Sequence, residues 1–187
     1  PPPIYTLFPY TTLFRSRGVL TNICDQVLAL PQTRESFGLL HADFGDGNFT
    51  IDYANGQITV FDFDDCAYGP FLYDLADAWT KGVGWAQFER TPEARQKKMN
   101  SYFTSVLSGY AMENTLPADW EDRLPLFVKV VEMEALLGEY QRAMAIGEPL
   151  DEADEELAYR IKCLEEEIPF MGFFDPIYSP DAPFCVS

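Results

Sequence analysis

The segment from His41 to Asp65 constrains this chain more than any other part of its sequence. It reads HADFGDGNF, then a predicted hairpin, then VFDFDD. Residues 49–53 and 57–63 are rich in strand-forming residues, and the Asn-Gly pair between them is typical of a tight hairpin turn. We therefore expect the second strand to fold back beside the HADFGDGN loop.

Three oxygen-bearing side chains of this segment are predicted to converge. Asp43 and Asn48 lie five residues apart on one glycine-containing loop, and Asp62 ends the second strand. Mg²⁺ prefers a few hard oxygen ligands with positions left open for phosphate oxygens. Phosphoryl transfer needs such a metal and a carboxylate that orients the attacking hydroxyl. The pattern predicts this chemistry, with plain turn formation by Asp43 and Asn48 as the alternative.

Three motifs in order resemble those of a known family. H-A-D-x-x-x-x-N, F-D-F and G-P-F-L-Y-D-L-A (residues 69–76) resemble the loops of the aminoglycoside phosphotransferase and choline kinase family, relatives of the protein kinases. Members typically read H-G-D, so Ala42 departs from the pattern. The resemblance covers residues 37–77 firmly, and from there to residue 168 it rests on helical content.

The resemblance implies a role for each matching residue. Asp43 is then the catalytic carboxylate, and Asn48 and Asp62 hold Mg²⁺ under the phosphates of ATP or GTP. His41 braces the loop, and Asp74 ties the following helix to it.

Each supporting residue has a simpler interpretation. His41 follows an apolar run and can be a satisfied core residue, while Asp74 can be a helix N-cap. Asp64 and Asp65 are either additional metal ligands or a solvated turn.

The fold class implied is α+β: the C-terminal lobe of a protein-kinase-like fold, mostly helical, with a short β-hairpin carrying the catalytic and metal loops. Apolar spacing and capping residues predict helices over 19–30, from 72 onward, and over 92–112, 124–146 and 151–167. Residues 37–40 are a candidate strand, and AYGPFLYD (residues 67–74) is predicted to be a loop. Residues 169–187 form an irregular tail rich in Pro and aromatic residues.

The first residues have an unusual origin. Residues 6–16 read TLFPYTTLFRS, which one frame of a common short-read sequencing adapter encodes. We expect residues 1–16 to be an artefact and residues 17–168 to be the phosphotransferase lobe. The alternative is an aromatic strand built on Phe8, Tyr10, Leu13 and Phe14.

Residues 17–37 cannot supply the phosphate-covering loop, lysine and glutamate of a kinase N-terminal lobe. That lobe is therefore expected to be absent, with no nucleotide-covering residues present. The sequence predicts a truncated fragment with very weak or no ATP-dependent activity.

Charge and composition limit the partners. The formal charge is −17, which repels nucleic acid and anionic membranes and tolerates a cationic ligand. The four cysteines form no CxxC pair, no apolar run has the length of a membrane span, and a cytoplasmic location is expected.

The acceptor is expected to be a small hydroxylated molecule, cationic or neutral, such as an aminoglycoside, choline or homoserine. Acidic side chains and tryptophans of the helical part can line its pocket, or they can be helix surface and core. They are Glu113, Glu132, Glu134, Glu139, Asp151, Glu152, Trp79, Trp85 and Trp120. The alternative function is a non-catalytic kinase-fold binding or regulatory module. The acceptor, the choice of ATP or GTP and the oligomeric state stay open.

Overall fold

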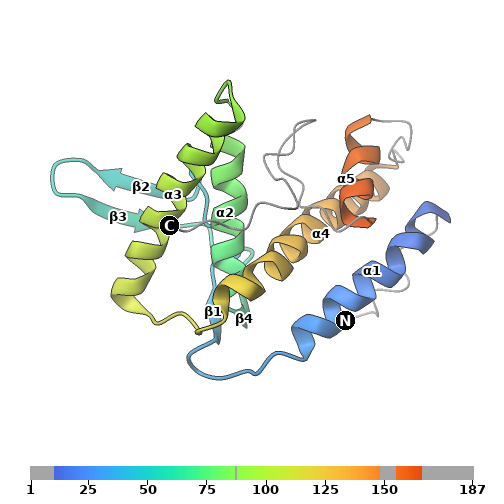
Figure 1. Ribbon diagram of the computed structural model, residues 1–187, viewed down its shortest axis with the longest axis horizontal. Helices are drawn as coiled ribbons and strands as arrows, with labels where there is room; N and C mark the ends of the chain where they lie inside the picture. Colours follow the sequence, from blue (N-terminus) through green and yellow to red (C-terminus); the bar gives the residue numbers. More distant parts are fainter. Residues whose placement is uncertain (1–10, 87, 148–154, 166–187) are drawn as a thin grey trace.

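The computed structural model describes residues 11–86, 88–147 and 155–165. The four short strands follow one another between α1 and the other helices (Figure 1), and this segregation of strands from helices along the chain is that of an α+β fold. Their order is α1 (Thr11–Leu28), β1 (Phe37–Leu40), β2 (Phe49–Asp52), β3 (Gln57–Val60), β4 (Ala67–Pro70), α2 (Leu72–Ala86), α3 (Pro92–Glu113), α4 (Trp120–Ile146) and α5 (Glu155–Glu165).

The helices bury the core. α2 packs against both α3 and α4, and α1 packs against α4 and α5 (Figure 1). The fully buried side chains of Leu124, Phe127 and Val128 lie on α4, in the cluster that joins it to α2 and α3. A second cluster joins α1, α4 and α5 through residues such as Ile23 and Ile161. Among the described helices, none is both long and apolar enough to cross a membrane.

Local signals set the start of α3 and the end of α4 as predicted, whereas the helix predicted over residues 19–30 begins at Thr11 and ends at Leu28. The Thr91 side chain accepts a hydrogen bond from the Ala94 N–H at 3.2 Å, and Pro92 occupies the first turn of α3. Gly147 ends α4 with φ of 74°, a left-handed conformation that glycine adopts without strain. α4 begins at Trp120, four residues before its predicted start, and α5 buries Leu157 and Ile161 as its spacing predicts.

The predicted hairpin is confirmed, although its second strand is shorter than expected. β2 and β3 pair antiparallel, with Phe49 opposite Val60 and Asp52 opposite Gln57. The turn between them contains Gly56 at φ of 75°. β3 ends at Val60 rather than at residue 63, and the chain then leaves the sheet toward the HADFGDGN loop.

The prediction of a loop over residues 67–74 is wrong. Residues 67–70 form β4, which pairs antiparallel with β1 through Gly38 opposite Gly69, and α2 begins at Leu72. The Gly-Pro pair suggested a turn, but close packing explains the glycines. A β-carbon on Gly38 would lie 2.6 Å from the Phe71 ring, and one on Gly69 would lie 2.8 Å from Leu40.

The aromatic-strand alternative for the N-terminal residues is wrong where it can be examined. α1 runs continuously from Thr11 to Leu28, so residues 11–16 are helical. Residues 1–10, residues 151–154 of the predicted last helix and the predicted tail at 169–187 lie outside the described residues. The adapter origin stays a prediction.

Candidate active site

The HADFGDGN loop is fixed to the start of α2 by Asp74. One carboxylate oxygen of Asp74 accepts the backbone N–H of His41 at 3.0 Å, and the other accepts that of Ala42 at 2.9 Å. Asp74 lies in the first turn of α2 rather than at its N-cap, because the helix begins at Leu72. A carboxylate there also interacts favourably with the positive end of the helix dipole.

Two residues of the site have left-handed backbone conformations although they carry side chains. Ala42 has φ of 64° and Asp62 has φ of 62°. Such a conformation costs a non-glycine residue about 1–2 kcal/mol, and it persists where the surroundings enforce it. Ala42 stands where the resembled family typically has glycine, a residue that adopts this conformation without strain.

The Asp43 carboxylate is held at both oxygens. Asn48 Nδ2 donates to Oδ2 at 2.8 Å and to the backbone oxygen of Asp43 at 2.7 Å. Lys81 Nζ donates to Oδ1 at 2.7 Å. The hydrogen bond from Lys81 lowers the pKa of Asp43 against the opposing effect of burial. The carboxylate is therefore ionised and fixed in orientation at neutral pH.

Lys81 is shared with a second, buried carboxylate. Its Nζ donates to Asp77 Oδ2 at 2.8 Å, and Asp77 is only 7% exposed. Burial raises the pKa of Asp77, with Lys81 opposing the shift. Burial also disfavours the charge of Lys81, but hydrogen bonds to Asp43 and Asp77 outweigh it and raise the pKa of the lysine.

The loop makes room for this lysine at Gly45. A β-carbon on Gly45 would lie 3.0–3.2 Å from the Lys81 side chain. The sequence analysis missed Lys81 and Asp77. The available signal was the spacing of Asp74, Asp77 and Lys81, because residues at i, i+3 and i+7 share one helix face.

His41 links the loop to the end of the hairpin. Its Nε2 is 3.1 Å from the Phe61 carbonyl oxygen, and its ring contacts those of Phe44 and Phe63. Nε2 therefore carries the proton and donates it. The other ring nitrogen, Nδ1, is buried and has no hydrogen-bond partner among the described residues. The interpretation of His41 as a core residue with both ring nitrogens hydrogen-bonded is therefore wrong.

Hydrogen bonds to the Phe61 backbone hold the chain directly before Asp62. Phe61 N donates to the Asn48 carbonyl oxygen at 3.0 Å, so the residue before Asp62 is bonded to both His41 and Asn48. The Asp62 side chain is exposed. Asp64 and Asp65 are exposed in the following turn, which the bond from Cys66 N to the Phe63 oxygen closes at 3.1 Å.

The donor chemistry fits a hard divalent cation. The Asn48 amide nitrogen is used on Asp43, which leaves the amide oxygen as a free acceptor. Within the described residues, no group of three or more His, Cys, Asp or Glu side chains gathers around a metal position. A cation held by Asn48 and Asp62 would therefore take its other ligands from phosphate and water, as Mg²⁺ commonly does.

The Asp43 side chain lines a hollow of about 460 Å³. That volume suits a small organic ligand. A second pocket, beside Pro31 and Phe71, holds only about 20 Å³, which is space for about one water molecule. The larger hollow is lined by Asp43, Gly45, Asp46, Gly47, Asn48, Lys81, Gly84, Trp85 and Phe88.

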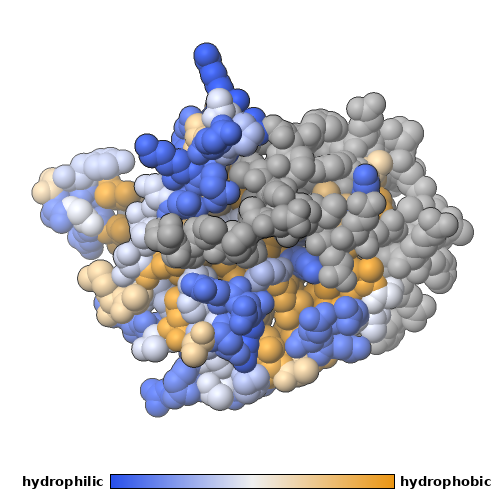
Figure 2. Space-filling model, in the orientation of Figure 1, coloured by the Kyte–Doolittle hydropathy of each residue, from blue (hydrophilic) through white to orange (hydrophobic). Residues whose placement is uncertain are grey.

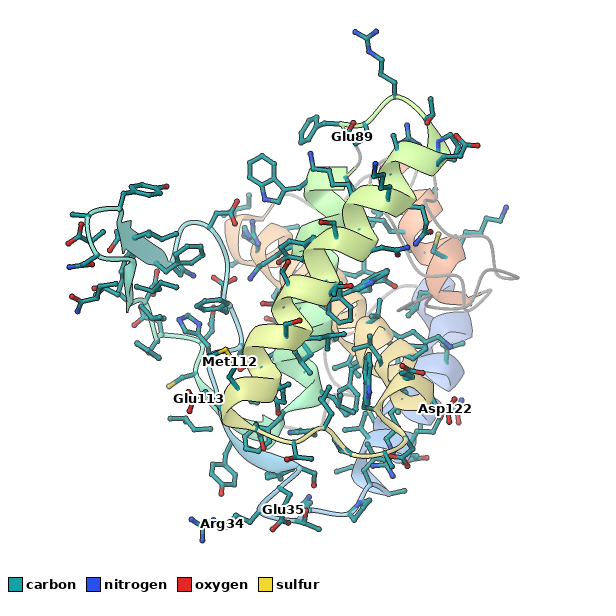
Figure 3. The ribbon with its side chains drawn as sticks, turned by 60° about the vertical axis from the view of Figure 1, so that its left-hand side comes forward. Arg34, Glu35, Glu89, Met112, Glu113 and Asp122 are labelled. Atoms are coloured by element: carbon teal, nitrogen blue, oxygen red, sulfur yellow. The ribbon has the colours of Figure 1, made fainter. Side chains whose placement is uncertain are left out.

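Among the described residues, the acidic side chains suggested for acceptor binding do not line this hollow. Tyr73 donates to Glu134, and Arg160 pairs with Glu139. Figure 3 shows Glu113 at one end of α3 and Glu89 at the turn before its other end. Glu132 is half-buried on α4, and residues 151 and 152 lie outside the described part.

The three tryptophans differ in their surroundings. Trp79 is buried in the core, and Trp120 packs against the core beside Phe103. Trp85 instead faces the hollow and is 52% exposed. The core interpretation therefore holds for Trp79 and Trp120 and fails for Trp85.

Similarity to known proteins agrees with this geometry. The sequence model described as the phosphotransferase enzyme family matches residues 13–113. This chain belongs to the phosphotransferase enzyme family. The family resemblance predicted from three motifs is thereby confirmed.

Two relatives extend the comparison of this phosphotransferase family member. Amicoumacin kinase of Bacillus subtilis (strain 168) is 30% identical over 155 residues, which span 81% of this chain and 44% of the relative. The solved structure of amicoumacin kinase hAmiN, in complex with AMP-PNP, Ca²⁺ and Ami, matches 92% of this chain and 50% of that chain. Its TM-score is 0.72 and its identity 25%. The chain thus has a partial kinase-like fold and spans about half the length of these relatives.

Proposed function

We propose that this chain carries the catalytic carboxylate and the metal-binding residues of an ATP-dependent phosphotransferase that phosphorylates a hydroxyl of a small molecule. The observation that carries the proposal is the Asp43 carboxylate, held by Lys81 and Asn48 at the edge of a hollow of ligand size. Two similar proteins named as kinases, one of them bound to AMP-PNP and Ca²⁺, support it.

Asp43 orients the acceptor hydroxyl and accepts its proton. An ionised carboxylate offers about four lone-pair positions, and the side-chain bonds from Asn48 and Lys81 occupy two of them. The remaining positions can accept the acceptor O–H without breaking either bond. The two bonds fix the carboxylate before the acceptor arrives, so little reorganisation is needed during transfer.

Asn48 and Asp62 would hold Mg²⁺. When bound, the ion neutralises charge on the phosphate oxygens of ATP or GTP. His41 and Asp74 act as positioning residues, because one bonds to the residue preceding Asp62 and the other to the loop that carries Asp43. The left-handed backbone at Ala42 and Asp62 is consistent with a turn maintained for function.

Turnover by these 187 residues alone is expected to be very weak, because they span about half the length of the two kinases. The decisive test therefore measures metal binding. Mn²⁺ can replace Mg²⁺ as a paramagnetic probe, and in the presence of AMP-PNP it should broaden the side-chain amide NMR signals of Asn48. In Asp62→Asn, the same broadening should require a Mn²⁺ concentration at least about tenfold higher.

Asp64→Asn and Asp65→Asn are the matched controls, since both remove an exposed carboxylate within three residues of Asp62. Neither should alter the broadening. Any transfer of labelled phosphate from ATP to kanamycin, choline or homoserine should disappear in Asp43→Asn. Broadening that is insensitive to Asp62→Asn, or transfer that survives Asp43→Asn, would contradict the assignment.

A further inference from the structure

Two exposed aromatic side chains lie beside the candidate catalytic carboxylate. Trp85 is 52% exposed in the last turn of α2, and Phe88 is 73% exposed in the turn that follows. Their ring centroids are 6.3 Å apart and their planes differ by 56°. Both line the hollow that contains Asp43. Large aromatic surfaces left in water next to reactive groups commonly mark a ligand site.

Lys81, whose ammonium group bonds to Asp43, and Trp85 lie on one face of α2. Lys81 and Trp85 are four residues apart on α2, so their side chains are neighbours on its surface. Lys81 is fixed by its bonds to Asp43 and Asp77. The indole therefore lies beside Lys81 and lines the same hollow as the Asp43 carboxylate.

Two glycines of the hollow have open space around them. A β-carbon added to Gly84 or to Gly47 would meet no atom within 4 Å. Both glycines also line the hollow, so no side chain at these two positions obstructs the approach of a ring.

The charged groups around the hollow favour a cationic ligand. Asp43 and Asp46 line it with negative charge, and Asp46 is exposed. The one lysine that lines it, Lys81, is shared between Asp43 and Asp77, so its positive charge is already compensated. A ligand amine would meet a net negative surface.

We propose that Trp85 and Phe88 bind a flat ring of the acceptor, and that the acceptor is an amine-bearing aromatic alcohol whose amine lies toward Asp46. This proposal rests on the proposed function for the role of Asp43. The ring packs on the two aromatic side chains, the hydroxyl reaches Asp43, and the acidic surface attracts the amine.

A suitable probe is 2-amino-1-phenylethanol, which combines a ring, an aliphatic hydroxyl and an amine. The chain contains three tryptophans, and their indole N–H signals can be followed separately by NMR, with Trp85→Phe assigning one of them. The probe should shift the Trp85 signal and leave in place those of the buried Trp79 and the partly buried Trp120. Ethanolamine, which lacks the ring, and 2-phenylethanol, which lacks the amine, should each bind more weakly.

Substitutions test whether the aromatic pair is responsible. Phe88→Ala should weaken binding of the probe about three- to tenfold, as loss of one aromatic contact predicts. The side chain is largely exposed, so the fold should be kept. Tyr53→Ala is the control, because Tyr53 is a 91% exposed aromatic residue in the β2–β3 turn. It should leave the affinity unchanged.

The outcomes separate this proposal from the proposed function. Asp62→Asn should weaken metal binding at least about tenfold while leaving the shift of the Trp85 signal intact. Selective, Phe88-dependent binding without any metal binding would support the aromatic site and contradict the kinase assignment. Metal binding that depends on Asp62 would support the kinase assignment whatever the probe does. The aromatic site would be overturned if millimolar probe did not shift the Trp85 signal, or if Phe88→Ala bound the probe with unchanged affinity.

Discussion

Lys81 holds two carboxylates that have different surroundings. Asp77 is buried, whereas the Asp43 side chain is about half exposed toward the hollow. The two acids would repel each other without a cation between them, and Asp77 would be charged in a poorly solvated position. Lys81 therefore contributes both to the stability of α2 and to the placement of Asp43.

Replacing this lysine should destabilise the fold. Lys81→Met keeps the length of the side chain and removes its charge, which leaves the Asp77 carboxylate without its ammonium partner. We expect the free energy of unfolding to fall by about 1–3 kcal/mol, measured by urea denaturation. Lys98→Met breaks the exposed pair with Glu89 and should cost less than about 1 kcal/mol. Equal costs for the two variants would show that the Asp77 contact adds no stability.

The spacing of the motifs predicted the oxygen-bearing residues of the loop and the hairpin, but it did not predict Lys81. The pattern of Asp43, Asn48 and Asp62 depends on one loop and one hairpin, both encoded locally. Lys81 reaches the same place from 38 residues away, and its direction depends on how α2 docks. Sequence spacing could put Asp74, Asp77 and Lys81 on one face, but it could not say that this face meets the loop.

Among the secondary-structure elements, α2 and α3 approach each other closely at a glycine. A β-carbon on Gly82 of α2 would lie 2.3 Å from the Tyr102 ring of α3. The Tyr102 hydroxyl donates to the Ala78 carbonyl oxygen at 3.0 Å, so the ring is held in that position. The glycine therefore permits the contact between the two helices.

Alanine substitutions at two helix glycines should have opposite effects. Gly82→Ala gains helix propensity but forces the β-carbon into the fixed Tyr102 ring, and it should lower the free energy of unfolding by about 1–3 kcal/mol. Gly109→Ala lies on α3 with open space around it and should raise it by about 0.5–1 kcal/mol. Thermal and urea denaturation of both variants would check this. A stabilising Gly82→Ala would show that the helices separate without cost.

Elements encoded by short-range signals were predictable, and those that depend on distant partners were not. The hairpin follows from its Asn-Gly turn, and α3 from Thr91 and Pro92. β4 was missed because its partner, β1, lies some thirty residues earlier and its Gly-Pro sequence suggests a turn. The end of β3 was misplaced because the chain turns at Asp62, whose φ of 62° is incompatible with a strand, although Phe61 N still bonds to the Asn48 oxygen in the register of the hairpin.

Among the described residues, exposed apolar side chains lie on the strands as well as on the loops and helices. The β2–β3 hairpin extends away from the helices in Figure 1, and its surface combines hydrophilic and hydrophobic residues in Figure 2. Ile51 and Ile58 face each other across the hairpin and are both exposed. Each strand pair has only two strands, so both have unpaired edges, which favours association with another chain.

We therefore expect concentration-dependent self-association through the hairpin, detectable by sedimentation velocity. The charge of −17 opposes it, so association should increase as salt screens that repulsion. Ile51→Lys combined with Ile58→Glu replaces the apolar pair by an ion pair and leaves the net charge unchanged, so a loss of association would report the lost apolar contact. Met112→Lys combined with Ile146→Glu makes the same change at exposed helix positions and should leave association as it was. If both double variants behave alike, the hairpin is not the contact surface.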